Sequence, residues 1–147
     1  MVFSRACAYG LRAMLYMAAQ PKNQRVLVSE TAARLEIPAP FLAKIIQTLS
    51  RQSLVDSQKG PGGGVRLGRP IEEITLLQVM EAIDGLGLVE VCVMGMRECS
   101  DEVACPLHET WTGLREQIVD MLSDQNIAEV AEQLKKRNIF LVQPTEE

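Results

Sequence analysis

Aromatic residues and long apolar runs are both scarce in this sequence. Phenylalanine, tyrosine and tryptophan together make up 4% of the 147 residues, so there is little material for stacking the bases of single-stranded nucleic acid. No uninterrupted apolar run reaches the roughly 18 residues that a membrane-spanning helix needs. The stretch 6–19 has the length of a signal-peptide core, but Arg12 lies in its middle. We therefore expect a cytoplasmic protein without a membrane partner.

The residue sets of common catalytic sites are also missing. His108 is the single histidine, and the sequence shows no Ser-His-Asp arrangement and no paired catalytic carboxylates. The glycine-rich segment 60–64 resembles a loop that cradles nucleotide phosphates. However, Val65 and Arg66 follow it, whereas a P-loop ends in Gly-Lys-Ser or Gly-Lys-Thr. The sequence therefore favours a binding protein over an enzyme.

Basic and acidic residues are distributed unevenly along the chain. Residues 1–70 contain ten basic and three acidic residues, a net charge of +7, and residues 71–147 contain five basic and sixteen acidic residues, a net charge of −11. The contents of 47% hydrophobic and 23% charged residues are those of an ordinary globular protein. This asymmetry indicates a polyanion-binding module joined to a second element, although chance segregation of solvated charges produces the same numbers.

The basic half predicts a helix-turn-helix. Apolar residues at helical spacing predict a first helix that ends near residues 20–21. Ser29 is the predicted N-cap of a second helix. Pro38 discourages continuation of that helix, and Pro40 is predicted to be the first residue of a third one.

The third predicted helix has an apolar face and a polar face. Leu42, Ile45, Ile46 and Leu49 form the apolar face. The opposite face suits the DNA major groove, because small side chains permit close approach, Gln pairs with adenine, and Lys or Arg pairs with guanine or phosphate. A merely solvated amphipathic helix is the alternative. The candidate DNA contacts on this helix are Ala39, Pro40, Ala43, Lys44, Gln47 and Arg51.

A hairpin with a glycine-rich tip follows the third helix. Residues 54–59 and 65–67 are predicted strands on either side of a tight glycine turn at 60–64. Glycines let such a tip lie close to a phosphate backbone or in the minor groove, and basic residues surround it. The candidate DNA contacts of this wing are Lys59, Gly60, Gly62, Gly63 and Arg66.

Three of the four cysteines cluster in the acidic half. Cys92, Cys99 and Cys105 are followed by His108 with the spacing C-x6-C-x5-C-x2-H. In a reducing compartment this pattern favours soft-metal ligation or thiol redox chemistry over structural disulfides. Thiolates suit iron-sulfur clusters, whereas the paired C-x2-C motifs of structural zinc sites are missing. The spacing leaves a cluster, zinc and unligated cysteines open, and Cys7 is predicted to be a core residue.

An apolar stripe with alternating spacings of four and three follows the cysteines and predicts a dimerisation helix. Packing of this helix on its own domain is the alternative. The stripe consists of Leu107, Trp111, Leu114, Ile118 and Met121. The expected fold class is mainly α with a small β wing. It comprises a winged helix-turn-helix domain (1–84), a cysteine-containing cluster-binding loop (85–106), a long dimerisation helix with a short C-terminal helix (107–138) and a tail (139–147).

Four segments carry a resemblance to a known family. They are YGLRAML at 9–15, FLAKI at 41–45, KGPGGG at 59–64 and TLLQVMEAIDG at 75–85. In this order they resemble the Rrf2 family of winged-helix transcription regulators, which contains IscR and NsrR. The resemblance implies a homodimer on a palindromic double-stranded DNA operator, with the third helix in the major groove and the wing in the minor groove. Ala43 stands where some members carry a longer polar base-contacting residue, which implies a different operator preference.

The resemblance also implies an iron-sulfur cofactor. Cys92, Cys99 and Cys105 lie where cluster-binding members carry their cysteines. Cys105 and His108 look like the Cys-x-x-His ending of IscR-type proteins, in which the histidine completes a [2Fe-2S] site. NsrR-type proteins take the fourth ligand from an acidic residue of the partner's first helix, where this sequence has Ala8. The resemblance therefore favours [2Fe-2S] over the alternative, [4Fe-4S], with His108 as the candidate fourth ligand.

The expected function is that of a dimeric transcription regulator whose operator affinity depends on an iron-sulfur cluster. The cluster would sense redox state, nitric oxide or iron-sulfur status. Within the same fold, a cluster-free thiol-redox regulator and a zinc-binding regulator are the alternatives. An iron-sulfur electron carrier and an interaction module without DNA binding are more distant ones, and salt-dependent binding to a palindromic promoter fragment distinguishes them from a regulator.

Overall fold

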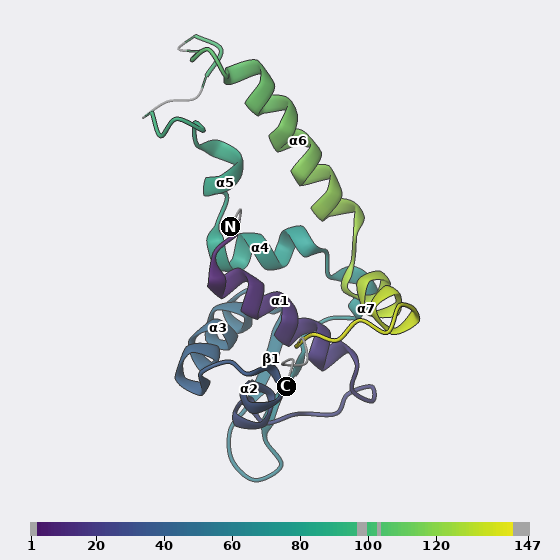
Figure 1. Ribbon diagram of the computed structural model, residues 1–147. Helices are drawn as coiled ribbons and strands as arrows, with labels where there is room; N and C mark the ends of the chain where they lie inside the picture. Colours follow the sequence, from purple (N-terminus) through teal and green to yellow (C-terminus); the bar gives the residue numbers. More distant parts are fainter. Residues whose placement is uncertain (1–2, 97–99, 103, 143–147) are drawn as a thin grey trace, which may run out of the picture.

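Helices dominate the structure, and one pair of short antiparallel strands interrupts them (Figure 1). The computed structural model describes residues 3–96, 100–102 and 104–142. Its elements are α1 Arg5–Ala18, α2 Val28–Leu35, α3 Ala39–Arg51, β1 Val55–Gln58, β2 Gly64–Leu67, the 3-10 turn η1 Ile71–Glu73, α4 Leu76–Asp84, α5 Gly87–Glu90, α6 His108–Asp124 and α7 Ile127–Lys136. The predicted fold class, mainly α with a small wing, is confirmed.

The main core lies between α1, α2, α3, the strands and α7. All four residues predicted to face inward from α3, namely Leu42, Ile45, Ile46 and Leu49, are at most 5% exposed. Burying each such side chain contributes about 1.5–3 kcal/mol. The buried stripe therefore fixes which face α3 turns to solvent.

The helix ends differ from the prediction at three places. Ser29 is not an N-cap, because α2 already begins at Val28 after the extended residue Leu27. A bridge between Val26 and Val65 keeps the chain extended up to that point, so the helix begins directly after it. Pro40 is the second residue of α3 rather than the first. Proline is also favoured at the first position of a helix, which predicts a helix start at Pro106, but α6 begins two residues later at His108.

The wing is the antiparallel pair β1–β2. Its register pairs Val55 with Leu67 and Asp56 with Arg66, and Ser57 lies opposite Val65. Gly64 has a φ of +128°, and a Cβ there would lie 2.5 Å from the Val26 carbonyl oxygen. Only glycine therefore lets the start of β2 approach the chain segment that precedes α2.

The second half of the chain folds back onto α1. A capping box between Thr75 and Gln78 starts α4. Cys7, Met80 and Leu122 then form a small core that joins α1, α4 and α6. Figure 1 shows α5 and most of α6 extending away from the body formed by α1–α3. None of the described helices is long and apolar enough to cross a membrane.

Candidate nucleic-acid interface and cysteine site

The polar face of α3 is available for contact with DNA. Ala39, Pro40, Lys44, Gln47 and Arg51 are exposed, and Ala43 is half-buried. These residues lie opposite the buried stripe, so a duplex can approach them without disturbing the core. This places two cations and one amide on a single protruding helical surface.

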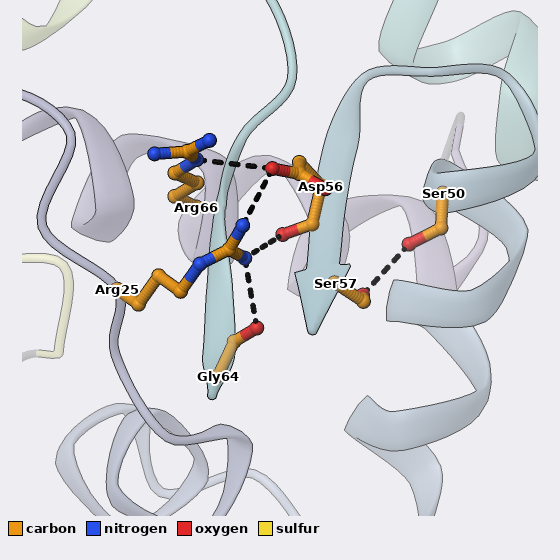
Figure 2. Close-up of polar contacts among 6 residues, drawn as sticks. All are labelled: Arg25, Ser50, Asp56, Ser57, Gly64 and Arg66. Atoms are coloured by element: carbon orange, nitrogen blue, oxygen red, sulfur yellow. Dashed lines mark hydrogen bonds and ion pairs between the residues drawn. The ribbon is translucent and has the colours of Figure 1, made fainter. Parts of the chain in front are cut away.

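The wing lies beside α3 and is attached to it. The Ser50 hydroxyl of α3 and the Ser57 hydroxyl of β1 are hydrogen-bonded at 3.0 Å (Figure 2). At the tip, the Gly63 amide donates to the Gly60 carbonyl oxygen at 2.9 Å and closes the turn. Lys59, Gly60 and Gly62 are exposed, whereas Gly63 is half-buried. Four of the five predicted wing contacts, all except Arg66, thus lie at a protruding tip next to α3.

Arg66 has a different environment from the other predicted contacts. It is half-buried, and its Nε donates to Asp56 Oδ2 at 3.0 Å. Successive residues of a strand face opposite sides, so Asp56 faces away from the side on which Ser57 contacts α3. Figure 2 shows Arg66 on that same far side, beside Arg25. Arg66 as a DNA contact stays a prediction.

Sequence reasoning missed Arg25 and Asp56. Arg25 Nη2 lies 2.7 Å from Asp56 Oδ2, and hydrogen bonds from Arg66 and Arg25 hold the pKa of the Asp56 carboxyl below its ordinary value. One signal was present, because Asp56 is among only three acidic residues in positions 1–70. The contact itself spans 31 positions in the sequence, so no local pattern shows it.

Two of the predicted thiol ligands come together. Cys92 Sγ and Cys105 Sγ lie 3.8 Å apart. Two thiolates bound to one tetrahedral metal ion at about 2.3 Å each would lie about 3.8 Å apart. Cys92 is 4% exposed and Cys105 is half-buried, so the pair is partly shielded from water. The two thiols therefore fit ligation of one tetrahedral iron or zinc ion.

His108 lies at the start of α6 and is 8% exposed. Its Nε2 is 3.0 Å from Asp101 Oδ1. A carboxylate bound to one ring nitrogen is a common partner of metal-binding histidines, because it fixes the tautomer and the orientation of the ring. The His108 amide also donates to the Cys105 carbonyl oxygen at 3.0 Å, so the two candidate ligands share one turn.

Within the described part of the chain, the predicted ligand set is incomplete. Among the described residues, no three His, Cys, Asp or Glu side chains are grouped as a metal site. Cys99 lies outside the described residues, as does the end of the predicted tail at 143–147. Cys7 is fully buried, as predicted, and burial together with the charge of Asp84 raises the pKa of its thiol to about 11.

The segment that carries Cys92 is tied to α6. Trp111 Nε1 donates to the Val91 carbonyl oxygen at 2.9 Å. Cys92 follows the end of α5 almost directly, and Cys105 precedes α6 by three residues. The thiol pair therefore lies between the end of α5 and the beginning of α6.

The structure has the features of a winged helix-turn-helix protein, a class that binds double-stranded DNA. The recognition helix is α3, which its buried apolar residues hold in place, and the strands β1 and β2 form the wing beside it. Comparison with known families agrees, since residues 3–133 match the Rrf2 family, described as iron-dependent transcriptional regulators. The chain belongs to the Rrf2 family, and it is a DNA-binding transcriptional regulator, not an enzyme.

Relatives extend over most of the chain. A protein from Aquifex aeolicus described as an HTH-type transcriptional regulator is 32% identical over 144 residues, which cover 97% of this chain and 99% of the relative. An HTH-type regulator from Azotobacter vinelandii is 33% identical over 83% of this chain and 74% of its own length.

Solved structures share the fold at lower identity. CymR, the global cysteine regulator of B. subtilis, superposes with a TM-score of 0.74 at 20% identity and covers 89% of this chain and 96% of its own. IscR from T. potens also gives a TM-score of 0.74, at 19% identity, over 93% of this chain and 90% of its own. These likenesses establish the winged-helix architecture.

Proposed function

We propose that this regulator works in the cytoplasm as a homodimer on a palindromic operator, with an affinity controlled by an iron-sulfur cluster. The cluster is held by Cys92, Cys99 and Cys105, with His108 as the fourth ligand, and is a [2Fe-2S] rather than a [4Fe-4S] group. The observation that carries this proposal is the 3.8 Å separation of Cys92 Sγ and Cys105 Sγ beside the histidine-bearing start of α6. The family's description as iron-dependent supports it.

The protein's own residues link this site to DNA through α6. A bound cluster would supply redox chemistry. Cys92 and Cys105 connect the end of α5 to the start of α6, which would be the dimer helix. Two recognition helices must match half-sites roughly 34–36 Å apart, so fixing this junction fixes their separation. Coupling of this kind typically changes affinity by about 5- to 150-fold.

Anaerobic purification tests the cofactor. Iron and acid-labile sulfide are quantified, and absorption and Mössbauer spectra are recorded. We expect about two iron and two sulfide atoms per chain with the spectrum of a [2Fe-2S] cluster. Four of each would correct the cluster type, whereas zinc in place of iron, or a metal-free protein after anaerobic reconstitution, would overturn the cluster proposal.

The same 3.8 Å separation favours one second candidate, a cluster-free thiol switch. A disulfide between Cys92 and Cys105 needs the sulfur atoms to approach to about 2.05 Å. The two thiols would together lose two electrons and two protons to hydrogen peroxide, which is reduced to two water molecules. In a metal-free protein, this candidate predicts a reversible loss of two titratable thiols and a change in operator affinity that dithiothreitol restores.

The DNA contacts are expected to divide into backbone and base contacts. Lys59→Ala should weaken binding to every duplex and lower the salt slope by about one unit, because one phosphate contact is lost. Gln47→Ala should relax the preference at one base position by about 1–3 kcal/mol. Lys135→Ala, at an exposed lysine of α7, is the control. Fluorescence anisotropy over a salt series checks this assignment, which is wrong if Lys59→Ala alters sequence preference and leaves the salt slope unchanged.

A further inference from the structure

Arg25 occupies an unusual place at the base of the wing. It lies in the segment between α1 and α2, and its side chain is only 15% exposed. Its guanidinium donates to both strands: Nη1 contacts the Asp56 carbonyl oxygen at 3.0 Å and the Gly64 carbonyl oxygen at 3.3 Å, and Nη2 contacts Asp56 Oδ2 at 2.7 Å (Figure 2). A single side chain from outside the hairpin therefore bridges β1 and β2.

Asp56 completes the arrangement. Its Oδ2 accepts from Arg25 and also from Arg66 Nε, its partner across the strands. The neighbouring backbone adds two hydrogen bonds, from the Val26 amide to the Val65 carbonyl oxygen at 2.9 Å and from the Val65 amide to the Val26 carbonyl oxygen at 2.8 Å. We call Arg25, Asp56 and Arg66 the wing clamp.

The wing is thus fastened on both faces. On one face, Ser57 bonds Ser50 of α3, and on the other face the wing clamp joins the strands to the α1–α2 connection. A two-stranded hairpin is marginally stable by itself, so its direction depends on these attachments. Val55 and Val65 also anchor the strands in the main core beside α3. The hydroxyl pair adds one neutral hydrogen bond to this packing, whereas the clamp adds charge-assisted bonds, which are the stronger kind.

The charge of Asp56 is the second observation. A carboxylate on the wing of a DNA-binding protein repels phosphate, and the hydrogen bonds from Arg66 and Arg25 lower the pKa of Asp56 further below its ordinary value, so it is ionised at neutral pH. Electrostatics alone would therefore favour a neutral residue at this position. The contacts that Asp56 makes with two arginines offer a reason for keeping the acid there.

We propose that Arg25 and Asp56 are positioning residues for the wing, which set operator specificity without touching DNA. They hold the wing at a fixed angle to α3, so that Lys59 and the glycine tip enter the minor groove when α3 lies in the major groove. This inference rests on the proposed placement of the wing in the minor groove. Arg25 acts through its planar fork of donors, which a lysine ammonium cannot reproduce.

The test uses Arg25→Lys and Asp56→Asn in the full chain, with Arg69→Lys as the matched control. Arg69 is exposed, and a lysine ammonium can also make its bond to the Gln52 carbonyl oxygen. Affinities are measured for an operator, for operators altered only at minor-groove positions or only at major-groove positions, and for a non-specific duplex. Melting temperatures report folding.

In both clamp variants, the ratio of affinities that distinguishes operators altered at minor-groove positions is expected to fall by about 5- to 150-fold, the range of one lost base contact. The discrimination at major-groove positions should be unchanged. Arg69→Lys should behave as the wild type. A purely structural role would instead lower the melting temperature and reduce both kinds of discrimination equally, which would overturn the proposal.

Asp56→Asn distinguishes positioning from simple repulsion. If Asp56 acts only through its charge, Asp56→Asn raises affinity for every duplex and leaves discrimination unchanged, and the proposal is wrong. If the wild type itself shows no preference at minor-groove positions, the placement of the wing is wrong, and the inference falls with that placement. If the wild type and both clamp variants discriminate equally at minor-groove positions, the wing placement stands and only the positioning role of the clamp is wrong.

Discussion

Replacing Cys92 or Cys105 by alanine is expected to abolish stable cluster binding while leaving a folded dimer. Each substitution leaves one member of the 3.8 Å thiol pair without the other, so an iron atom loses a ligand that no other described cysteine can replace. The same result is expected for Cys99→Ala, and His108→Ala should leave a labile or spectrally altered cluster. Iron and sulfide content after anaerobic reconstitution measures the loss, and operator affinity should change by about 5- to 150-fold.

Cys7→Ala is the control for this series. Cys7 is fully buried in the small core beside Met80 and Leu122, and its raised pKa keeps the thiol protonated at neutral pH. It is therefore expected to retain the full cluster content, with at most a modest loss of thermal stability from the small cavity. Equal operator binding by reconstituted wild type and Cys105→Ala would contradict control of DNA binding by the cluster.

Local periodicity and turn residues were sufficient to predict α1, α2, α3 and the wing. The apolar stripe of α3 matches the buried residues one for one, because a 3.6-residue period and a single apolar face leave only one orientation toward the core. The hairpin was predicted because a short glycine-rich turn between two strand-forming segments strongly favours a β-hairpin over other local structures. The N-cap at Ser29 failed, since a bridge between Val26 and the distant Val65 decides where α2 begins.

The candidate site was predictable only where its residues lie close in sequence. The cysteine and histidine spacing identified the thiol pair, yet spacing alone cannot distinguish a cluster from zinc or a disulfide, because all three use the same thiolates. The wing clamp was not predictable, since Arg25 reaches Asp56 only after the hairpin has folded against the α1–α2 connection. Tertiary contacts of this kind leave no periodic trace in the chain.

Leu114→Glu is expected to convert the proposed dimer to a monomer and to lower operator affinity by about 100-fold or more. Leu107, Leu114 and Met121 are 49%, 47% and 54% exposed. Their seven-residue spacing places them on one stripe of the helical segment. α6 packs on α4 and α5 of its own chain, and this packing takes up Trp111 and Ile118, which are half-buried. The other three members of the stripe remain exposed. A second copy of the same stripe is the complementary surface for it.

The size of the effect follows from the operator. A dimer binds its second half-site intramolecularly, which raises affinity by about 10²–10⁴ over a single half-site, and a monomer loses this gain.

Light scattering should show the mass falling to the 16.3 kDa of one chain, while circular dichroism stays unchanged because Leu114 is not part of the protomer's core. Ser123→Glu puts the same charge about two and a half turns along the helix, on the opposite face, and should remain a dimer. A dimeric Leu114→Glu would mean that the copies associate through another surface, and the cysteine segment could then no longer set half-site spacing through α6.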